Sequence, residues 1–109
     1  MYRSNNNSAV IVKGARYMPC TLTDESSGKT YKLNVKEPKL KVYKQFEALN
    51  NSSEIEDIIA VTAAALSSNK ENIKITTELV EEVFTLDEIT QFFEDFTSWI
   101  AETRNNDPN

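Results

Sequence analysis

The chain has 109 residues, a formal net charge of −5, two glycines, one cysteine and no histidine. A chain of this length has room for one domain with a single modest core. This composition excludes imidazole bases, imidazole metal ligands and glycine-rich phosphate loops, so we expect neither a metal site nor a cofactor. Cys20 stands alone, which excludes an intramolecular disulfide and a cysteine-rich zinc site, and we expect it to be a small buried apolar residue.

Charge is distributed unevenly along the chain. Residues 1–46 contain nine basic and three acidic residues, whereas residues 47–109 contain three basic and fourteen acidic residues. Two interpretations stay open: the two parts solvate one compact domain, or their opposite charges align copies head to tail or attract a charged partner. The larger acidic part repels phosphates within a Debye length of about 8–10 Å, so we expect no nucleic acid partner.

Membrane insertion and secretion are also not expected. The longest apolar run, residues 58–66, falls far short of the ~20 residues that span a bilayer. The first ten residues carry one arginine and an Asn/Ser cluster, where a signal peptide has a basic patch followed by a long apolar segment. We therefore expect a cytoplasmic protein without a membrane partner.

The first part of the chain has the pattern of short strands. Residues 9–13 are apolar and largely β-branched, and residues 17–23 and 30–35 flank the turn-rich segment DESSGK. Within 30–35, apolar and polar residues alternate, which is typical of a half-buried strand. We expect a hairpin, with Pro19 placing the beginning of its first strand at an edge or a bend.

A first helix is predicted to begin at Glu37-Pro38 and to end near residues 50–51. Proline is tolerated at the first helical position, and glutamate beside it complements the helix N-terminus. The apolar face of this helix contains Val42, Tyr43, Phe46 and Leu49.

A second helix is predicted over residues 53–66. Ser53 and Glu56 have the spacing of a capping box, and the acidic residues of the first turn suit the positive end of the helix dipole. The apolar stripe contains Ile55, Ile58, Ile59, Val61, Thr62, Ala65 and Leu66. Residues 67–75 form a polar link with room for one turn of helix.

Two further helices follow this link. Residues 76–77 offer a cap to a short helix with three inward residues, Leu79, Val80 and Val83. Thr85 and Glu88 repeat the capping-box spacing, so we expect the chain to break at residues 84–86 and to begin a last helix there.

These elements predict one α+β domain, mainly α, over residues 1–109. A β-hairpin or small antiparallel sheet at the N-terminus is followed by about four short helices. Residues 1–8 and 102–109 are expected to be flexible tails.

The last helix carries more aromatic residues than an ordinary core stripe needs. Five residues fall within about 80° of arc at 100° per residue and are expected in the core: Leu86, Ile89, Phe93, Phe96 and Ile100. Phe92 and Trp99 widen this stripe on one flank. Either two neighbouring elements cover them, or they form an exposed anchor for a partner.

Acidic residues on the last helices occur as adjacent pairs at 81–82, 87–88 and 94–95. Adjacent helical residues point about 100° apart, so such a pair does not converge on one reacting atom. The spacing of a calcium loop is also absent. We expect a solvated acidic face, and the residues predict no catalytic site.

The order of these segments resembles the tail assembly chaperones of long-tailed bacteriophages and prophages of Gram-positive bacteria. The resemblance covers about Gly28 to Ala101 and lies in four consecutive stretches: GKTYKLNVKEP, KLKVYKQFEAL, SEIEDIIAVTAAAL and ELVEEVFTLDEITQFFEDFTSWI. It is a pattern of order and spacing without a catalytic motif. The N-terminal segment, residues 1–16, is longer than the pattern of these proteins would have it. We expect it to form an added strand or an arm that reaches a neighbour.

The resemblance implies a mainly helical protein without enzymatic activity. Such chaperones coat the helical tape measure protein before the tail tube polymerises, and they self-associate. A longer frameshifted form commonly adds a C-terminal domain that recruits the tail tube protein. All of this takes place in the host cell cytoplasm.

The sequence therefore favours a non-enzymatic chaperone that binds the tape measure protein, with Phe92 and Trp99 as the first candidates for the binding surface. The alternative is a small acidic adaptor or inhibitor, antitoxin-like or DNA-mimicking, that acts through its Glu/Asp-rich C-terminal helices. Salt separates the two, because charge-driven binding weakens with ionic strength and apolar capture survives it.

Overall fold

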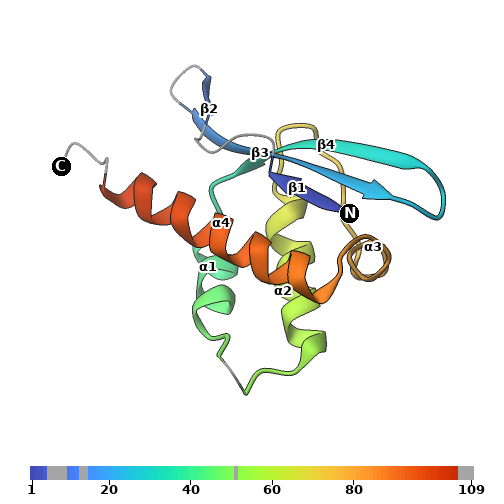
Figure 1. Ribbon diagram of the computed structural model, residues 1–109. Helices are drawn as coiled ribbons and strands as arrows, with labels where there is room; N and C mark the ends of the chain where they lie inside the picture. The colour runs from blue at the N-terminus through green and yellow to red at the C-terminus, as the bar shows by residue number, and fades with distance from the viewer. Residues whose placement is uncertain (5–9, 13–14, 51, 106–109) are drawn as a thin grey trace.

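The structure is a computed structural model that describes residues 1–4, 10–12, 15–50 and 52–105. These residues form an antiparallel sheet followed by four helices, which confirms the expected α+β class (Figure 1). In chain order the elements are β1 Tyr2–Ser4, β2 Val10–Val12, β3 Ala15–Asp24, β4 Lys29–Lys36, α1 Leu40–Glu47, α2 Ile55–Ser67, α3 Thr77–Val83 and α4 Leu86–Asn105. The last helix, with 20 residues, is longer than the short helices expected.

The sheet is built around β3. The predicted hairpin is confirmed, because β4 pairs with β3 from Asp24↔Lys29 to Tyr17↔Lys36. The other side of β3 pairs with two short strands placed end to end, β1 opposite residues 20–22 and β2 opposite residues 15–17. The strand expected at 9–13 is confirmed at Val10–Val12, and its two outer residues lie outside the described part of the chain.

Pro19 lies inside β3, which pairs with other strands on both of its sides. The expectation that Pro19 places the beginning of the hairpin's first strand at an edge or a bend is therefore wrong. On the β4 side, Pro19 pairs with Asn34. On the other side, β2 pairs only as far as Tyr17, and β1 pairs from Cys20 onward. Proline has no N–H to donate, and it is tolerated here because none of the described residues of β1 and β2 pairs with it.

The hairpin turn is held by Asp24 and Gly28. The Asp24 carboxylate accepts hydrogen bonds from the backbone and hydroxyl of Ser26, at 3.0 and 2.6 Å. These bonds hold the pKa of Asp24 below its ordinary value. Gly28 has φ +77°, a backbone conformation that glycine adopts without steric cost.

Helix α1 begins later than predicted and ends earlier. Its N-cap is Lys39, which is extended with ψ 158°, so Pro38 precedes the helix and does not start it. The C-cap is Ala48, two residues before the predicted end. The predicted apolar face is half-buried along its length, which makes α1 an outer layer on the other helices.

The capping box predicted at the start of α2 does not form. The N-cap is Glu54, without a side-chain bond to the helix, and the Ser53 hydroxyl instead accepts a bond from the Asn50 backbone N–H at 2.9 Å. The predicted stripe is buried toward the C-terminal half of the helix, at Val61, Thr62, Ala65 and Leu66. Ile55, expected in the stripe, is 45 % exposed because it is the first residue of a helix that projects beyond the sheet.

Apart from Ser67, which ends α2, the link at 67–75 contains no helix, and it is organised by a buried asparagine. The Asn69 amide donates to the carbonyls of Leu66 and Ile73 at 2.8 and 2.7 Å and accepts from the Ile73 N–H at 2.9 Å. Asn69 also forms an antiparallel bridge with Val35 of β4. The link is therefore fixed to the sheet.

The caps predicted for the last two helices are confirmed. Thr76 accepts a bond from the Leu79 N–H at 3.1 Å, which fixes the start of α3. At the start of α4, the Thr85 N–H donates to Glu88 at 3.0 Å and the Glu88 N–H donates to the Thr85 hydroxyl at 3.2 Å. This is the reciprocal capping box, and it places the break between α3 and α4 at the predicted point.

Both expected tails contain regular secondary structure where the structure describes them. Residues 2–4 form β1, and residues 102–105 continue α4. The other tail residues, 5–8 and 106–109, lie outside the described part of the chain.

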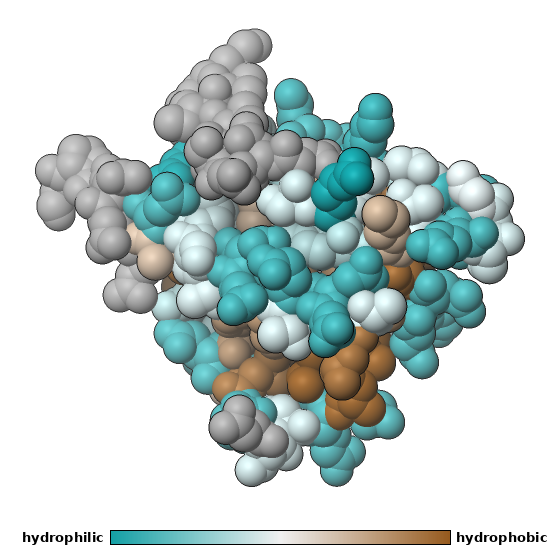
Figure 2. Space-filling model, in the orientation of Figure 1, coloured by the Kyte–Doolittle hydropathy of each residue, from teal (hydrophilic) through white to brown (hydrophobic). Residues whose placement is uncertain are grey.

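The helices cover one face of the sheet, with α2 against β4, α3 against β3 and α4 against β1 (Figure 1). On the side of the molecule shown in Figure 2, most of the described surface is hydrophilic. A hydrophobic area interrupts it where α2 and the first turn of α4 lie. Patches of this kind mark interaction sites when they are contiguous.

Candidate functional site

The buried face of α4 is not centred where the sequence places it. Phe92 and Phe96 are fully buried, Trp99 is 3 % exposed, and Leu86, expected in the core, is 70 % exposed. Phe93 and Ile100 are only half-buried. The helix is therefore rotated toward the flank of Phe92 and Trp99, and these two residues, which looked like a surplus, belong to its buried face.

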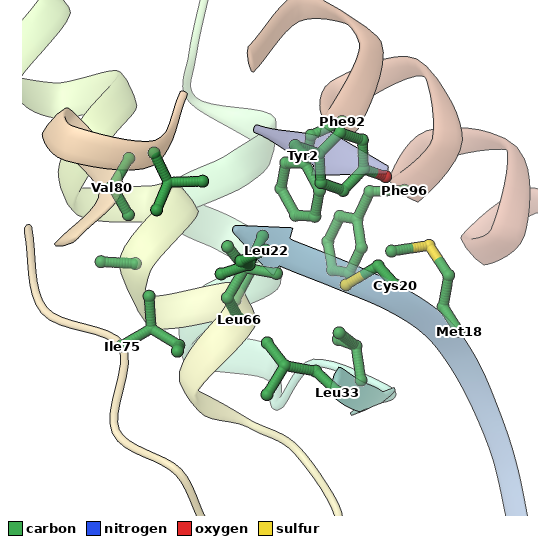
Figure 3. Packing of buried hydrophobic residues seen from close by; sticks show 14 of the residues in the cluster. Tyr2, Met18, Cys20, Leu22, Leu33, Leu66, Ile75, Val80, Phe92 and Phe96 are labelled. Carbon is green, nitrogen blue, oxygen red and sulfur yellow. The ribbon is translucent and has the colours of Figure 1, made fainter. Parts of the chain in front are cut away.

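Strand β1 covers this flank at Phe92. Figure 3 shows the Tyr2 ring beside Phe92. The ring of Tyr2 contacts Phe92 edge-on at 5.6 Å and stacks on Phe84 at 5.3 Å, and Phe92 stacks on Phe96 at 5.4 Å. The expectation that Phe92 and Trp99 form an exposed anchor is wrong, and the alternative, that neighbouring elements cover them, is confirmed.

Polar groups of α4 hold β1 in place. The Tyr2 hydroxyl donates to Asp95 at 2.8 Å, and the Tyr2 N–H donates to Glu88 at 3.2 Å. Gln91 donates to the second oxygen of Asp95 at 2.9 Å. Burial, and then the hydrogen bond to the Asp95 carboxylate, raise the pKa of Tyr2 far above its ordinary value. Glu88 and Asp95 are thus half-buried partners of β1, which corrects their expected place on a solvated face.

An open apolar groove of about 320 Å³ lies between α2, α3 and the start of α4. We call it the α2–α4 groove, and it is lined by Ile55, Ile59, Val80, Glu81, Phe84, Thr85, Leu86 and Ile89. Ile55 is 45 % exposed and Leu86 is 70 % exposed, and both are large apolar residues. The hydrophobic area in Figure 2 covers the same elements.

The break between α3 and α4 creates this groove. Phe84 leaves α3 in an extended conformation, with φ −95° and ψ 134°, and the capping box at Thr85 then starts α4 in a new direction. Leu86, the first residue of α4, is turned away from the sheet by this arrangement. Phe84 lies 6.2 Å from Phe92, ring to ring, so the buried aromatic face of α4 supports one wall of the groove.

The surroundings of the groove are acidic. The chain has three acidic residues between 50 and 69 and eight between 75 and 103, with no Lys or Arg in either range. These ranges include all of α2 and α3 and most of α4. Glu81 lines the groove itself. An apolar floor with an acidic border suits contact with a partner more than it suits chemistry on a small molecule.

A second, smaller groove of about 230 Å³ lies between α1 and α4. It is lined by Tyr43, Phe46, Glu47, Thr97, Ile100 and Ala101. Its large apolar residues are half-buried, and none of them projects as Leu86 does.

The described residues hold no group of three or more metal-ligating side chains that could bind a metal ion. Cys20 is fully buried in the sheet, and burial, followed by the charges of Glu71 and Asp95, raises its pKa to about 12. Its thiolate is therefore not accessible at neutral pH. Across the part of the chain that the structure describes, no helix has the length and apolarity to cross a membrane.

Sequence reasoning missed Ile55 and Leu86 as site residues because it assigned both to core stripes. A signal was present, since each residue directly follows an N-cap position, where a helix has only begun to approach the core.

No family model, curated protein or solved structure matches the chain.

Proposed function

We propose that this protein is a non-enzymatic tail assembly chaperone of a long-tailed bacteriophage or prophage, and that it binds a helical segment of the tape measure protein in the α2–α4 groove. The observation that carries the proposal is the pair Ile55 and Leu86, exposed at 45 % and 70 % beside an apolar groove. The resemblance of residues 28–101 to tail assembly chaperones supplies the class of partner.

The groove has the dimensions that this role requires. A cavity of about 150 Å³ takes up benzene, so about 320 Å³ has room for about two apolar side chains of that size. An amphipathic helix presents such side chains at positions i, i+3, i+4 and i+7. Two of them entering the groove would cover Ile55 and Leu86 and keep an apolar client from aggregating.

Phe92 and Trp99 keep an indirect part in this proposal. Both are buried, so neither touches the client in the folded protein. Phe92 contacts Phe84, which lines the groove, so Phe92 supports the binding surface from beneath.

The experiment measures the affinity for a fluorescently labelled helical fragment of a tape measure protein. We compare the double variant Ile55→Ser/Leu86→Ser with Leu40→Ser. Leu40 is the matched control, because it is 79 % exposed on α1 and does not line the groove. We expect the double variant to bind about tenfold or more weakly, since each buried Leu or Ile contributes about 1–2 kcal/mol.

The folded state is checked in the same samples by the emission of Trp99, which is buried away from both substitutions. A double variant that is folded and binds the fragment as the wild type does would overturn the assigned surface. Absence of binding by the wild-type protein would overturn the proposed function.

A second candidate function is a small acidic adaptor or inhibitor, antitoxin-like or DNA-mimicking. It is favoured by the absence of Lys and Arg from residues 50–69 and 75–103. In that case the partner is basic and the affinity collapses between low and moderate salt. Binding that depends on Ile55 and Leu86 and persists at moderate salt favours the chaperone.

Self-association, recruitment of the tail tube protein through a longer frameshifted form, and action in the host cell cytoplasm complete the proposal. All three come from the resemblance. Sedimentation velocity over a range of protein concentrations tests the first, and detection of a longer product of the same gene tests the second.

A further inference from the structure

Carboxylates line the α2–α4 groove or lie next in sequence to residues that line it. Glu54 and Glu56 flank Ile55, Asp87 follows Leu86, and Glu81 with Glu82 lies on α3. All five side chains are exposed. No Lys or Arg occurs on these elements up to residue 103 to balance them.

The first residues of α2 and α4, Ile55 and Leu86, line the groove, so two helix N-termini lie at it and partly offset this charge. Each carries about half a positive charge, so together they contribute about one unit. The five exposed carboxylates named above contribute five formal negative charges. The acidic residues of the first turns stabilise their own helices, but their number exceeds what the two dipoles neutralise, so the border of the groove is negative.

We propose that the α2–α4 groove selects an amphipathic helix whose apolar stripe is flanked by Lys or Arg. This inference rests on the function proposed above and adds the chemistry of the partner. Basic side chains at the edges of the stripe meet the carboxylates of the border, while their methylene stems lie along exposed apolar surface such as Leu86. A helix with acidic flanks meets like charge at the same positions.

A second copy of the chain is the rival occupant. Leu40 is 79 % exposed and stands between Lys39 and Lys41. It is therefore an exposed apolar side chain with basic neighbours, as the proposed partner helix presents. It offers one apolar side chain, whereas a client helix offers several that fill the groove and cover both Ile55 and Leu86. The client helix is therefore the occupant that the geometry favours.

The test uses three labelled synthetic helices with one common leucine stripe and with Lys, Gln or Glu at the flanking positions. Their affinities for the full chain are measured by fluorescence anisotropy at about 0.02 M and about 0.5 M salt, where the Debye length falls from more than 20 Å to below 5 Å. We expect the Lys peptide to bind about tenfold more tightly than the Gln peptide at low salt, as a few exposed ion pairs allow. The Glu peptide binds least, and the three affinities converge at high salt.

Matched variants separate charge from apolar contact. Glu81→Gln/Glu82→Gln is expected to reduce the preference for the Lys peptide over the Gln peptide severalfold. Glu94→Gln/Glu102→Gln removes the same charge from exposed positions of α4 that do not line the groove, and it is expected to leave most of the preference intact. Ile55→Ser/Leu86→Ser weakens all three peptides.

Each other outcome overturns a distinct statement. If the three peptides bind equally and depend on Ile55 and Leu86, the charge preference is wrong and the proposed function stands. If only the Lys peptide binds, and Ile55→Ser/Leu86→Ser leaves it unchanged, the acidic surface acts without the groove and the inference fails. If Leu40→Ser abolishes self-association and raises the affinity of every peptide, a second copy is the occupant and the inference fails. If neither these peptides nor the tape measure fragment binds, both the inference and the proposed function fail.

Discussion

Replacing Tyr2 with alanine tests whether β1 is part of the core. Tyr2 is 6 % exposed and places its ring between Phe84 and Phe92, at 5.3 and 5.6 Å. Removal of a buried aromatic ring costs about 3–5 kcal/mol of unfolding free energy. Most small domains have only about 5–15 kcal/mol in total, so Tyr2→Ala is expected to leave the protein marginally stable.

Two further variants divide this cost between ring and hydroxyl. Tyr2→Phe keeps the ring and removes only the 2.8 Å bond to Asp95, which Gln91 continues to satisfy in part, so we expect a loss of about 1 kcal/mol. Arg3→Ala changes the exposed neighbour on the same strand and is expected to change the unfolding free energy by less than about 0.5 kcal/mol.

Urea unfolding followed by the emission of Trp99 measures all three variants. Trp99 is the only tryptophan and is 3 % exposed, so its emission is blue-shifted in the folded monomer and moves to longer wavelength on unfolding. If Tyr2→Ala unfolds within about 0.5 kcal/mol of the wild type, β1 does not cover the aromatic face of α4 at Phe92.

Three further predictions concern the core and the link. First, Phe92→Ala is expected to cost about 3–5 kcal/mol, and Leu86→Ala less than about 0.5 kcal/mol, in the same urea assay; similar losses for both would contradict the rotation of α4. Second, Asn69→Ala removes three hydrogen bonds of a buried amide and is expected to cost about 2–3 kcal/mol, whereas the exposed neighbour Lys70→Ala is its near-neutral control. Third, the unfolding free energy is expected to fall as pH rises above 9. The pKa of Cys20 is about 12 in the folded protein and 9.0 ordinarily, so above pH 9 its thiol ionises in the unfolded chain alone. The loss approaches about 1.4 kcal/mol per pH unit for this one group, with an added contribution from Tyr2 above its ordinary value of 10.0. Cys20→Ala must show the shallower pH dependence; equal slopes would show that the thiol is not buried.

The local features that sequence predicts well are those set by neighbouring residues. The hairpin, the Thr76 cap and the Thr85–Glu88 capping box all depend on contacts within a few positions along the chain, and all three form. The capping box expected at Ser53 has the same spacing and does not form. There the Ser53 hydroxyl binds the backbone of Asn50 instead, and spacing alone does not decide between two nearby backbone donors.

Long-range contacts decided the features that sequence could not predict. Asn69 is a polar residue in a polar stretch, and its burial follows from its bridge to Val35, 34 positions earlier in the chain. Pro19 is accommodated because two separate strands pair with the same side of β3, and among the described residues neither strand pairs with Pro19. Neither feature can be predicted from the residues that are neighbours in sequence.

The rotation of α4 connects these observations to the candidate site. Periodicity gives the width of an apolar stripe, but the position of its centre depends on what packs against it. Here the packing element is β1, which lies more than eighty positions away from α4 in sequence and contributes Tyr2. When β1 covers the Phe92 flank, the opposite edge of the stripe, at Leu86, turns outward and joins Ile55 at the α2–α4 groove. The same contact thus buries the residues first expected to bind a partner and exposes the residues now proposed to do so.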